Sequence, residues 1–275
     1  MLLRFFALIV LCSQLYANER IIALSPAINE TLFALGAGNE VIANTEYCNY
    51  PPESKTRPKV GGYFSPSLEK ILSLRPSIVM LQENNAPLGE KLRALGIKTI
   101  VLKIDTYPSI RESIFTIARY VHKEEGGKRI VNELDQKLHA LKGIVKDQKI
   151  LMVFGHNTDL SKPLFVSGQN LYFDDIIRCS GNQNALQSKR KGQPVLNLEN
   201  IIALNPDIII LLAPNTHELG LSKEVLIRPW LNLPINAVTH QNIYVEDKEY
   251  SSNPSQRLGL FLDDIRGMLI HAQRH

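Results

Sequence analysis

One segment of this 275-residue chain occurs twice. Residues 68–81 read LEKILSLRPSIVML and residues 198–211 read LENIIALNPDIIIL, so all matched positions are separated by the same 130 residues. In each copy a pattern of helical periodicity ends at a proline, and an apolar run of strand length follows. Because one helix-turn-strand unit is encoded twice, the sequence predicts two similar lobes.

Strands and helices alternate around the first copy. Apolar runs at residues 21–24 and 99–102 are separated by segments of helical periodicity at 26–36 and 88–95. Such alternation is typical of a mostly parallel α/β sheet. A second apolar run at 150–154 begins 129 residues after the first, so the register of the repeat is kept. We therefore expect two Rossmann-like α/β lobes.

A long charged segment separates the two halves. Apolar residues follow one stripe of residues 124–146, which contain no strand candidate. At about 1.5 Å per residue, a helix of this length spans roughly 35 Å and could carry the chain from one lobe to the other. An ordinary surface helix within one domain is the alternative. The expected division is a signal peptide (1–17), an N-terminal lobe (18–123), a linking helix (124–146) and a C-terminal lobe (147–275).

The N-terminus has the pattern of an export signal. Arg4 precedes a short apolar run that ends at Cys12, and Ala17 offers a cleavage site. The run is much shorter than the roughly 20 residues of a membrane span, although an uncleaved anchor is the alternative. Leu11 stands where a lipoprotein signal normally has a small residue, which disfavours lipid attachment at Cys12. We expect the mature protein in the periplasm, with Cys48 and Cys179 as free, buried or half-buried thiols.

The charge of the chain excludes one class of partner. The formal net charge is +4, and loss of Arg4 with the signal leaves +3. Basic and acidic residues are evenly mixed, so no nucleic-acid surface is predicted.

Four aromatic residues lie on irregular segments of the first half. Tyr47 and Tyr50 belong to a loop rich in proline, and Tyr63 and Phe64 follow a Gly-Gly pair. Aromatic side chains beside glycines can form a stacking wall for a large planar ligand. The alternative is that Tyr50 and Phe64 only anchor the loops to the core.

Strong enzyme motifs are missing from the sequence, which has no Gly-x-Ser-x-Gly, phosphate-binding loop or metalloprotease helix. His156 follows the strand at 150–154, where strand ends in open α/β sheets face the ligand crevice. Two alternatives use this histidine. One is an exported hydrolase that pairs His156 with Asp159, and the other is a nickel or zinc receptor in which His156, His217 and His240 converge.

Glu69 and Glu199 open the two copies of the repeat. The helix dipole favours a carboxylate in a first turn by about 0.3–1 kcal/mol, so local stability alone could explain either residue. That explanation is weaker for the pair, because the duplication places one carboxylate at the matching point of each lobe.

The chain resembles a known family at three segments. These are LSPAINETLFALG at 24–36, YCNYPP at 47–52 and VGGYFSPSLE at 60–69. They resemble the cobalamin and iron-chelate class of periplasmic substrate-binding proteins, and the likeness extends from about residue 20 to the C-terminus. The resemblance implies a class III periplasmic binding protein of the helical-backbone type, with two lobes joined by a single long, rigid helix and ligand held between them. Because a rigid helix resists hinge motion, we expect little lobe closure on binding.

The same resemblance implies partners and site residues. The partners would be an inner-membrane ABC permease dimer with its ATPase subunits, and the receptor would act as a monomer without catalysis. Glu69 and Glu199 match the glutamates that dock onto permease arginines. The ligand-binding positions implied by the family or by the aromatic pattern are Tyr47, Tyr50, Tyr63, Phe64, His156, Asn157, Gln193, Asp247 and Tyr250.

The cargo is expected to be a corrinoid or a ferric complex, with no intrinsic cofactor and no resident metal. Tyr63 stands where the best-known cobalamin binder has a tryptophan, and Gln193 stands where it has an aromatic residue. The cleft segments hold no cluster of arginines, which weakens the case for a highly anionic ferric siderophore. Haem remains an alternative, with tyrosine and histidine available as axial ligands.

Overall fold

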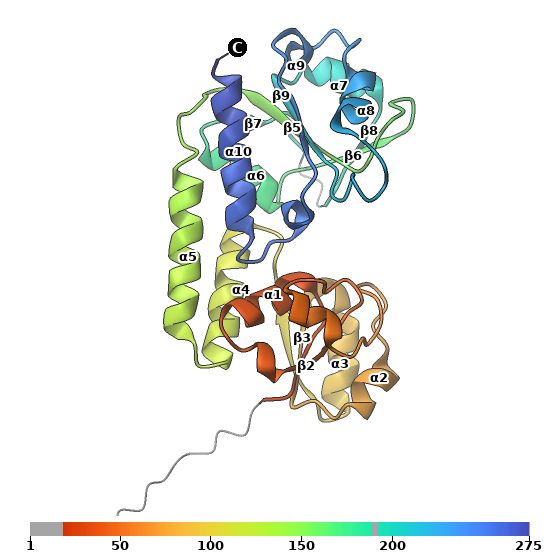
Figure 1. The fold of residues 1–275 in the computed structure, drawn as a ribbon, viewed down its shortest axis with the longest axis vertical. Coiled ribbons are helices and arrows are strands. Elements are labelled where there is room, and N and C mark those ends of the chain that lie inside the picture. Colours follow the sequence, from red (N-terminus) through yellow and green to blue (C-terminus); the bar gives the residue numbers. More distant parts are fainter. Residues whose placement is uncertain (1–18, 189–191, 275) are drawn as a thin grey trace, which may run out of the picture.

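The computed structural model describes residues 19–188 and 192–274. The expected signal peptide, including Cys12, lies outside the described residues. Two α/β lobes lie one above the other and are joined along one side by helices (Figure 1). No helix in the described ranges has the length and apolar character needed to cross a bilayer.

The first lobe contains a parallel sheet of four strands in the order β2-β1-β3-β4. Its elements are β1 (Ile21–Ala23), α1 (Pro26–Ala34), β2 (Val41–Asn44), α2 (Leu68–Ser73), β3 (Ile78–Gln82), α3 (Ala86–Ala94) and β4 (Lys98–Leu102). Alternate strand residues point to opposite faces. Ile21 packs with α1 on one face, whereas Ile22 packs with α2 and α3 on the other.

The second lobe contains a sheet in the order β10-β9-β5-β6-β8, and β7 pairs with β5. Strands β7, β9 and β10 run parallel to their neighbours, whereas β6 is antiparallel to both β5 and β8. The elements are β5 (Lys149–Phe154), β6 (Leu164–Val166), α6 (Tyr172–Cys179), β7 (Gln183–Asn184), β8 (Val195–Leu196), α7 (Leu198–Leu204), β9 (Ile208–Leu212), α8 (Lys223–Ile227), α9 (Asn236–Thr239), β10 (Ile243–Glu246) and α10 (Leu258–Ala272). Short 3₁₀ helices cover Gly38–Glu40, Pro52–Thr56, Glu83–Asn85, Arg228–Trp230 and Glu249–Ser252.

The repeated segments form the same unit in both lobes, α2-β3 and α7-β9. Each helix has a side-chain N-cap, Ser67 in the first copy and Asn197 in the second. Each turn uses a left-handed residue before the proline, because Arg75 and Asn205 both have φ of 47°. The repeat thus matches not only in apolar pattern but in backbone conformation at the turn.

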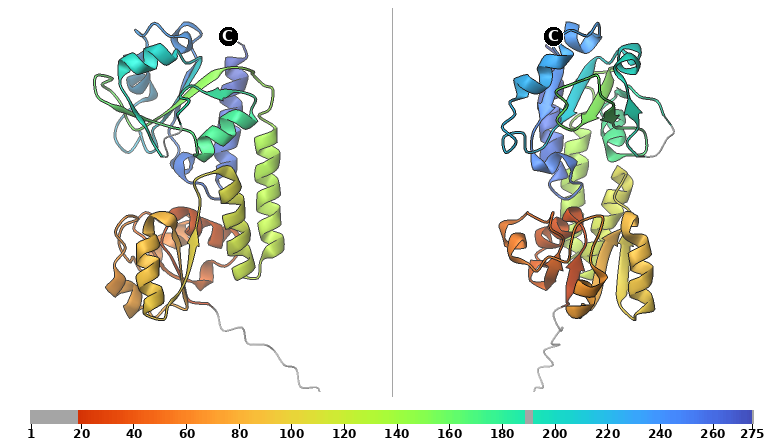
Figure 2. Two further views of the ribbon diagram at one scale, coloured as in Figure 1. Left: turned by 180° about the vertical axis from the view of Figure 1, so that it is seen from behind. Right: turned by 90° about the vertical axis from the view of Figure 1, so that its right-hand side faces the viewer.

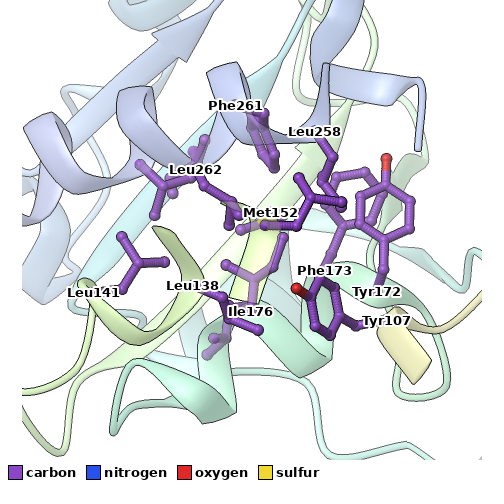
Figure 3. Close-up of a cluster of buried hydrophobic side chains, with 14 of the residues drawn as sticks. Tyr107, Leu138, Leu141, Met152, Tyr172, Phe173, Ile176, Leu258, Phe261 and Leu262 are labelled. Atoms are coloured by element: carbon purple, nitrogen blue, oxygen red, sulfur yellow. The ribbon is translucent and has the colours of Figure 1, made fainter. Parts of the chain in front are cut away.

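The link between the lobes is a pair of helices. α4 (Tyr107–Tyr120) and α5 (Glu124–His139) pack tightly, since a Cβ added at Gly127 would lie 2.6 Å from Cβ of Ala118. Figure 3 shows Tyr107 of α4 in the core cluster of the second lobe, beside Leu138 and Ile176. The other end of α4 packs on the first sheet through Ile117 and Ala118. Both helices therefore bridge the lobes, as Figure 2 shows from two sides.

Helix α5 is shorter than the expected 124–146. It ends at His139, and the chain then turns at Gly143 and Asp147, which have φ of 79° and 58°. Backbone N–H groups of these two residues donate to the carbonyls of Ser180 and Gly181. These hydrogen bonds to the end of α6 take the place of helical ones. The apolar residues that follow α5 therefore still pack into the core, although the helix has ended.

The two cysteines within the described residues, Cys48 and Cys179, are free thiols. Cys48 is buried, as expected, but Cys179 at the end of α6 is exposed.

Candidate functional site: the cleft between the lobes

A cavity of about 640 Å³ lies between the two lobes. Residues at the carboxyl ends of parallel strands from both lobes line it, as expected for open α/β sheets. Gln82 ends β3, Phe154 ends β5, and Pro214 follows β9. The volume falls within the usual range of about 300–1,000 Å³ for small-molecule sites.

The first lobe supplies the aromatic wall expected from the sequence. Tyr47, Tyr50, Tyr63 and Phe64 all line the cavity. Phe64 is 81% exposed and Tyr47 is 61% exposed, so neither residue is held in the core. The rings of Tyr63 and Phe64 meet edge to face with centroids 4.7 Å apart. This arrangement leaves apolar surface available to a ligand.

The hydroxyl of Tyr63 already has a hydrogen-bond partner in the protein. It donates to Oε1 of Gln82, whose Nε2 donates to Oγ of Ser25 at 3.0 Å. Burial raises the pKa of Tyr63 above its ordinary value. A neutral, hydrogen-bonded phenol is a poor axial ligand for a ferric ion, which suits this residue to stacking more than to coordination.

Tyr50 is held between the lobes. Nδ2 of Asn29 donates to its carbonyl at 3.0 Å, and the guanidinium of Arg257 lies 3.8 Å from the centroid of its ring. Arg257 comes from the other lobe, just before α10. A cation over the ring face fixes its orientation and links the wall to the second lobe.

A buried ion-pair network closes the base of the cavity. Nε and Nη2 of Arg257 donate to the carboxylate of Glu30, and Nη1 donates to Oε1 of Glu249 at 2.8 Å. Asn253 Nδ2 and Ser255 Oγ also donate to Glu30, both at 2.6 Å. Glu30 lies on α1, so four hydrogen bonds from the second lobe converge on one carboxylate of the first.

Among the described residues that line the cavity, acidic side chains outnumber basic ones. Its described charged residues are Glu30, Asp105 and Glu249 against Arg257. Because Arg257 is paired with two of these carboxylates, no free cation among the described lining residues offers a site for an anionic group.

The second lobe contributes aromatic residues that sequence reasoning missed. Phe154, Tyr172 and Phe173 line the cavity, and the Phe154 and Phe173 rings lie 5.3 Å apart. The backbone N–H of Tyr172 donates to the carbonyl of Asp105 at 2.6 Å, which fixes the start of α6 against the linker from the first lobe. In the sequence, Tyr172 and Phe173 stand out only as an aromatic pair at the start of a helix. Such a pair is equally typical of a helix that packs in the core.

The structure places the remaining expected residues in two groups. Gln193 lines the cavity, whereas His156, Asn157, Asp247 and Tyr250 are not among its lining residues. Nε2 of His156 is 2.7 Å from the carbonyl oxygen of Pro214, and Asn157 Nδ2 donates to the carbonyl of Phe154 at 2.8 Å. These two side chains therefore support lining residues through the backbone.

Asp247 and Tyr250 are engaged elsewhere in the second lobe. Asp247 pairs with Lys223 at 3.3 Å, and the hydroxyl of Tyr250 donates to Oδ2 of Asp264 at 2.7 Å. A hydrogen bond to a carboxylate stabilises the neutral phenol of Tyr250, in the same direction as burial, which is the largest cause of its raised pKa.

The metal-receptor and hydrolase alternatives find no assembled site. The described ranges contain no group of three or more His, Cys, Asp or Glu side chains able to hold a metal, so His156, His217 and His240 do not converge. The carboxylate of Asp159 accepts hydrogen bonds from the Ser161 backbone and hydroxyl rather than from His156.

Glu69 and Glu199 lie in the first turns of α2 and α7, and both are exposed. Helices α2 and α7 occupy the side of the molecule opposite α5, one on each lobe, in both Figure 1 and the rear view of Figure 2. Within the part of the chain that the structure describes, neither carboxylate forms an ion pair or a side-chain hydrogen bond.

Glu246, the last residue of β10, has a carboxyl group with a raised pKa. Burial is the largest cause that raises its pKa to about 7, and Asp264 and Asp247 act in the same direction. The pKa of Glu246 is higher in the folded protein than in the unfolded chain. The free energy of unfolding therefore falls as the pH rises from about 4.5 to 7, and it stays lowered above pH 7.

Glu246→Gln should therefore stabilise the protein at pH 8 by up to about 3 kcal/mol and have little effect at pH 4. The glutamine can still accept the hydrogen bond that Oε1 of Glu246 receives from the N–H of Lys248. Urea unfolding at both pH values measures the difference, with exposed Glu83→Gln as the control. A gain that is equal at the two pH values would contradict the assigned ionisation.

A two-lobed α/β fold with an aromatic cleft and a helical link defines a solute receptor. Residues 21–250 match the sequence model described as "Periplasmic binding protein", and the chain belongs to this family. The family resemblance drawn from the sequence is thereby confirmed.

The chain is similar to vitamin B12-binding proteins of other bacteria. The vitamin B12-binding protein of Vibrio cholerae serotype O1 is 23% identical over 249 residues, which cover 90% of this chain and 87% of that protein. The vitamin B12-binding protein of Pectobacterium carotovorum is 27% identical over 211 residues, with 74% and 75% of the two chains covered.

Solved structures share the fold. The periplasmic haem-binding protein RhuT of Roseiflexus sp. RS-1 is 25% identical, covers 93% of this chain and 99% of its own, and has a TM-score of 0.74. The periplasmic vitamin B12-binding protein BtuF of Vibrio cholerae is 21% identical with a TM-score of 0.78, and the coverage is 94% and 98%. The expected fold of two α/β lobes is confirmed.

Proposed function

We propose that this protein is the exported substrate-binding component of an ABC importer, which captures a metal chelate between its lobes and delivers it to an inner-membrane permease. The observation that carries the proposal is the interlobe cavity with aromatic side chains from both lobes, in a member of the periplasmic binding protein family. The receptor acts as a monomer, and the permease works with its ATPase subunits.

The lining charge favours a corrinoid over haem as cargo. Haem presents two carboxylates, which would meet Glu30, Asp105 and Glu249 with the guanidinium of Arg257 already paired. A corrin ring instead presents uncharged carboxamides, which are not repelled by these carboxylates. A ferric complex of low negative charge fits the same reasoning.

Haem is the second candidate, because several structural neighbours, such as RhuT, are haem-binding proteins. The hydroxyl of Tyr63 and the ring of His156 both have partners in the protein, so either would have to break a hydrogen bond to coordinate iron.

Spectroscopic titration of the purified mature protein tests the proposal. Cyanocobalamin, haemin, ferric chelates and free Ni²⁺ or Zn²⁺ are added in turn, and the absorbance spectrum and intrinsic fluorescence are followed. We expect saturable binding of cyanocobalamin that is tighter than binding of haemin. Binding of free metals without any chelate would overturn the proposal, as would turnover of a substrate by the protein alone.

Ligand binding should change the separation of the lobes little. Two helices, α4 and α5, bridge the lobes, and the Glu30–Arg257 network joins them at the base of the cavity. We expect the radius of gyration from solution scattering to change by less than about 1 Å on saturation with the bound chelate. A large contraction would show that the helical link bends as a hinge.

A further inference from the structure

The loop that carries Tyr47 and Tyr50 is held by polar groups rather than by large apolar side chains. It follows β2 and covers residues 45–57, which form no helix or strand except the 3₁₀ helix Pro52–Thr56. Its buried residues are all small, and they are Thr45, Cys48 and Ser54. Apolar burial therefore contributes little to the position of this loop, and hydrogen bonds define where its two tyrosines lie.

A buried network of two amides and a hydroxyl joins the loop to α1 and to the end of β2. Nδ2 of Asn29 donates to the carbonyl of Tyr50 at 3.0 Å and to Oγ of Ser54 at 2.6 Å. Nδ2 of Asn44 donates to Oδ1 of Asn29 at 2.9 Å and to Oγ of Ser54 at 3.0 Å. Because Asn29, Asn44 and Ser54 are fully buried, these hydrogen bonds are made away from water and favour one arrangement of the loop.

The ammonium group of Lys59 completes this network. Nζ donates to Oδ1 of Asn44 at 2.7 Å, to the carbonyl of Cys48 at 3.1 Å and to the carbonyl of Ser54 at 3.2 Å. These three acceptors match the three donors of an ammonium group. They come from the end of β2, from the chain between the two tyrosines and from the 3₁₀ helix. Burial disfavours the charged form and lowers the pKa of Lys59, and the three hydrogen bonds offset part of that penalty.

Lys59 also belongs to the segment that leads to the other two aromatic residues of the wall. A parallel bridge pairs its backbone with that of Asn44, and the N–H of Val60 donates to the carbonyl of Asn44 at 2.9 Å. Tyr63 and Phe64 follow a few residues later. The backbone of Lys59 thus fixes one aromatic segment to the end of β2, and its side chain fixes the other.

We infer that Lys59 is a positioning residue for ligand binding, whose ammonium group holds the loop of Tyr47 and Tyr50 where both side chains form the cavity wall. The inference rests on the proposed function. Lys59 is not among the residues that line the cavity, so it acts on the ligand through the loop and not by contact. Arg257 orients the ring of Tyr50, whereas Lys59 and Asn29 set the position of the backbone that carries it. A wall that is ordered in advance lowers the entropy cost of binding.

Lys59→Met tests the inference, because methionine keeps an unbranched side chain and removes the three donors. Titration with cyanocobalamin and with haemin gives Kd, and hydrogen exchange of the ligand-free protein, read by mass spectrometry, reports the order of each segment. For the chelate that the wild type binds, we expect Kd to rise roughly 5- to 30-fold. Exchange should become at least about tenfold faster in residues 45–57 and stay unchanged in β3 and β4 of the same lobe. If Lys59→Met fails to fold, Lys59→Gln, which keeps an amide donor, replaces it with the same expected directions.

The matched control is Lys55→Met, at an exposed lysine of the same 3₁₀ helix, which should keep the wild-type Kd and exchange. Faster exchange in the loop with an unchanged Kd would show that Lys59 only stabilises the loop, and would overturn the inference. Faster exchange throughout the first lobe, or a raised Kd with no change in the loop, would overturn it as well. Failure of the wild type itself to bind any chelate would instead reject the proposed function, and the inference with it.

Discussion

Replacing Glu69 and Glu199 together with alanine is expected to abolish uptake of the chelate while leaving its Kd unchanged. Both carboxylates are exposed, neither lines the cavity, and they lie on the same side of the two lobes. Truncating one partner of an interfacial charge pair costs about 2–5 kcal/mol. Two such losses would weaken docking on the permease by more than about a thousandfold.

Uptake of labelled chelate into proteoliposomes that contain the transporter measures the effect, and titration of the free receptor gives Kd. Each single variant should retain intermediate uptake, because the other lobe still docks. The control is Glu124→Ala with Glu133→Ala, two exposed glutamates of α5 on the opposite side of the molecule. If Kd rose in parallel with the loss of uptake, the glutamates would act on the ligand site rather than on docking.

Local sequence patterns predicted most of the fold. The repeat requires only apolar periodicity and a proline break, which are local properties, and both copies form the expected helix, turn and strand. The same holds for the alternation of strands and helices, and for the aromatic wall of the first lobe. Tyr63 and Phe64 could be recognised because they follow two glycines on an irregular segment. Their position in the sequence fits no helix or strand face that would bury them in the core.

The residues that the sequence did not reveal depend on contacts between distant segments. The side chains of Glu30 and Arg257 are 227 positions apart, and each alone has the pattern of a surface charge on or near a helix. α4 could not be assigned to both lobes from its periodicity, because apolar residues facing the first core and the second lie on one continuous stripe. His156 follows a strand end, but the direction of its side chain is set by the carbonyl of Pro214, 58 residues away.

Glu30→Ala is expected to destabilise the folded protein by about 3–5 kcal/mol, because it leaves a buried guanidinium without its main partner. The side chain of Glu30 is 3% exposed, and that of Arg257 is 10% exposed. The carboxylate also accepts hydrogen bonds from Asn253 and Ser255, whose donors would lose their partner. Urea unfolding of the variant without ligand measures the loss. Asp263→Ala is the matched control, since it breaks the more exposed pair with Lys137 and should cost less than about 1 kcal/mol.

The double variant Glu30→Leu with Arg257→Leu separates the electrostatic origin of this effect from a packing defect. Replacing both members of a buried pair by apolar residues removes the unpaired charge, so the variant should be more stable than Glu30→Ala by about 1–3 kcal/mol, although the donors of Asn253 and Ser255 stay unpaired. The recovered protein would still lack the cation over the ring of Tyr50, which lies 3.8 Å from the guanidinium. Its affinity for the chelate should therefore remain reduced although its fold is restored. A double variant as unstable as Glu30→Ala would show that the loss comes from packing and from the unpaired donors of Asn253 and Ser255 rather than from the lone charge of Arg257. Restored affinity would show that Arg257 does not hold the wall of the site.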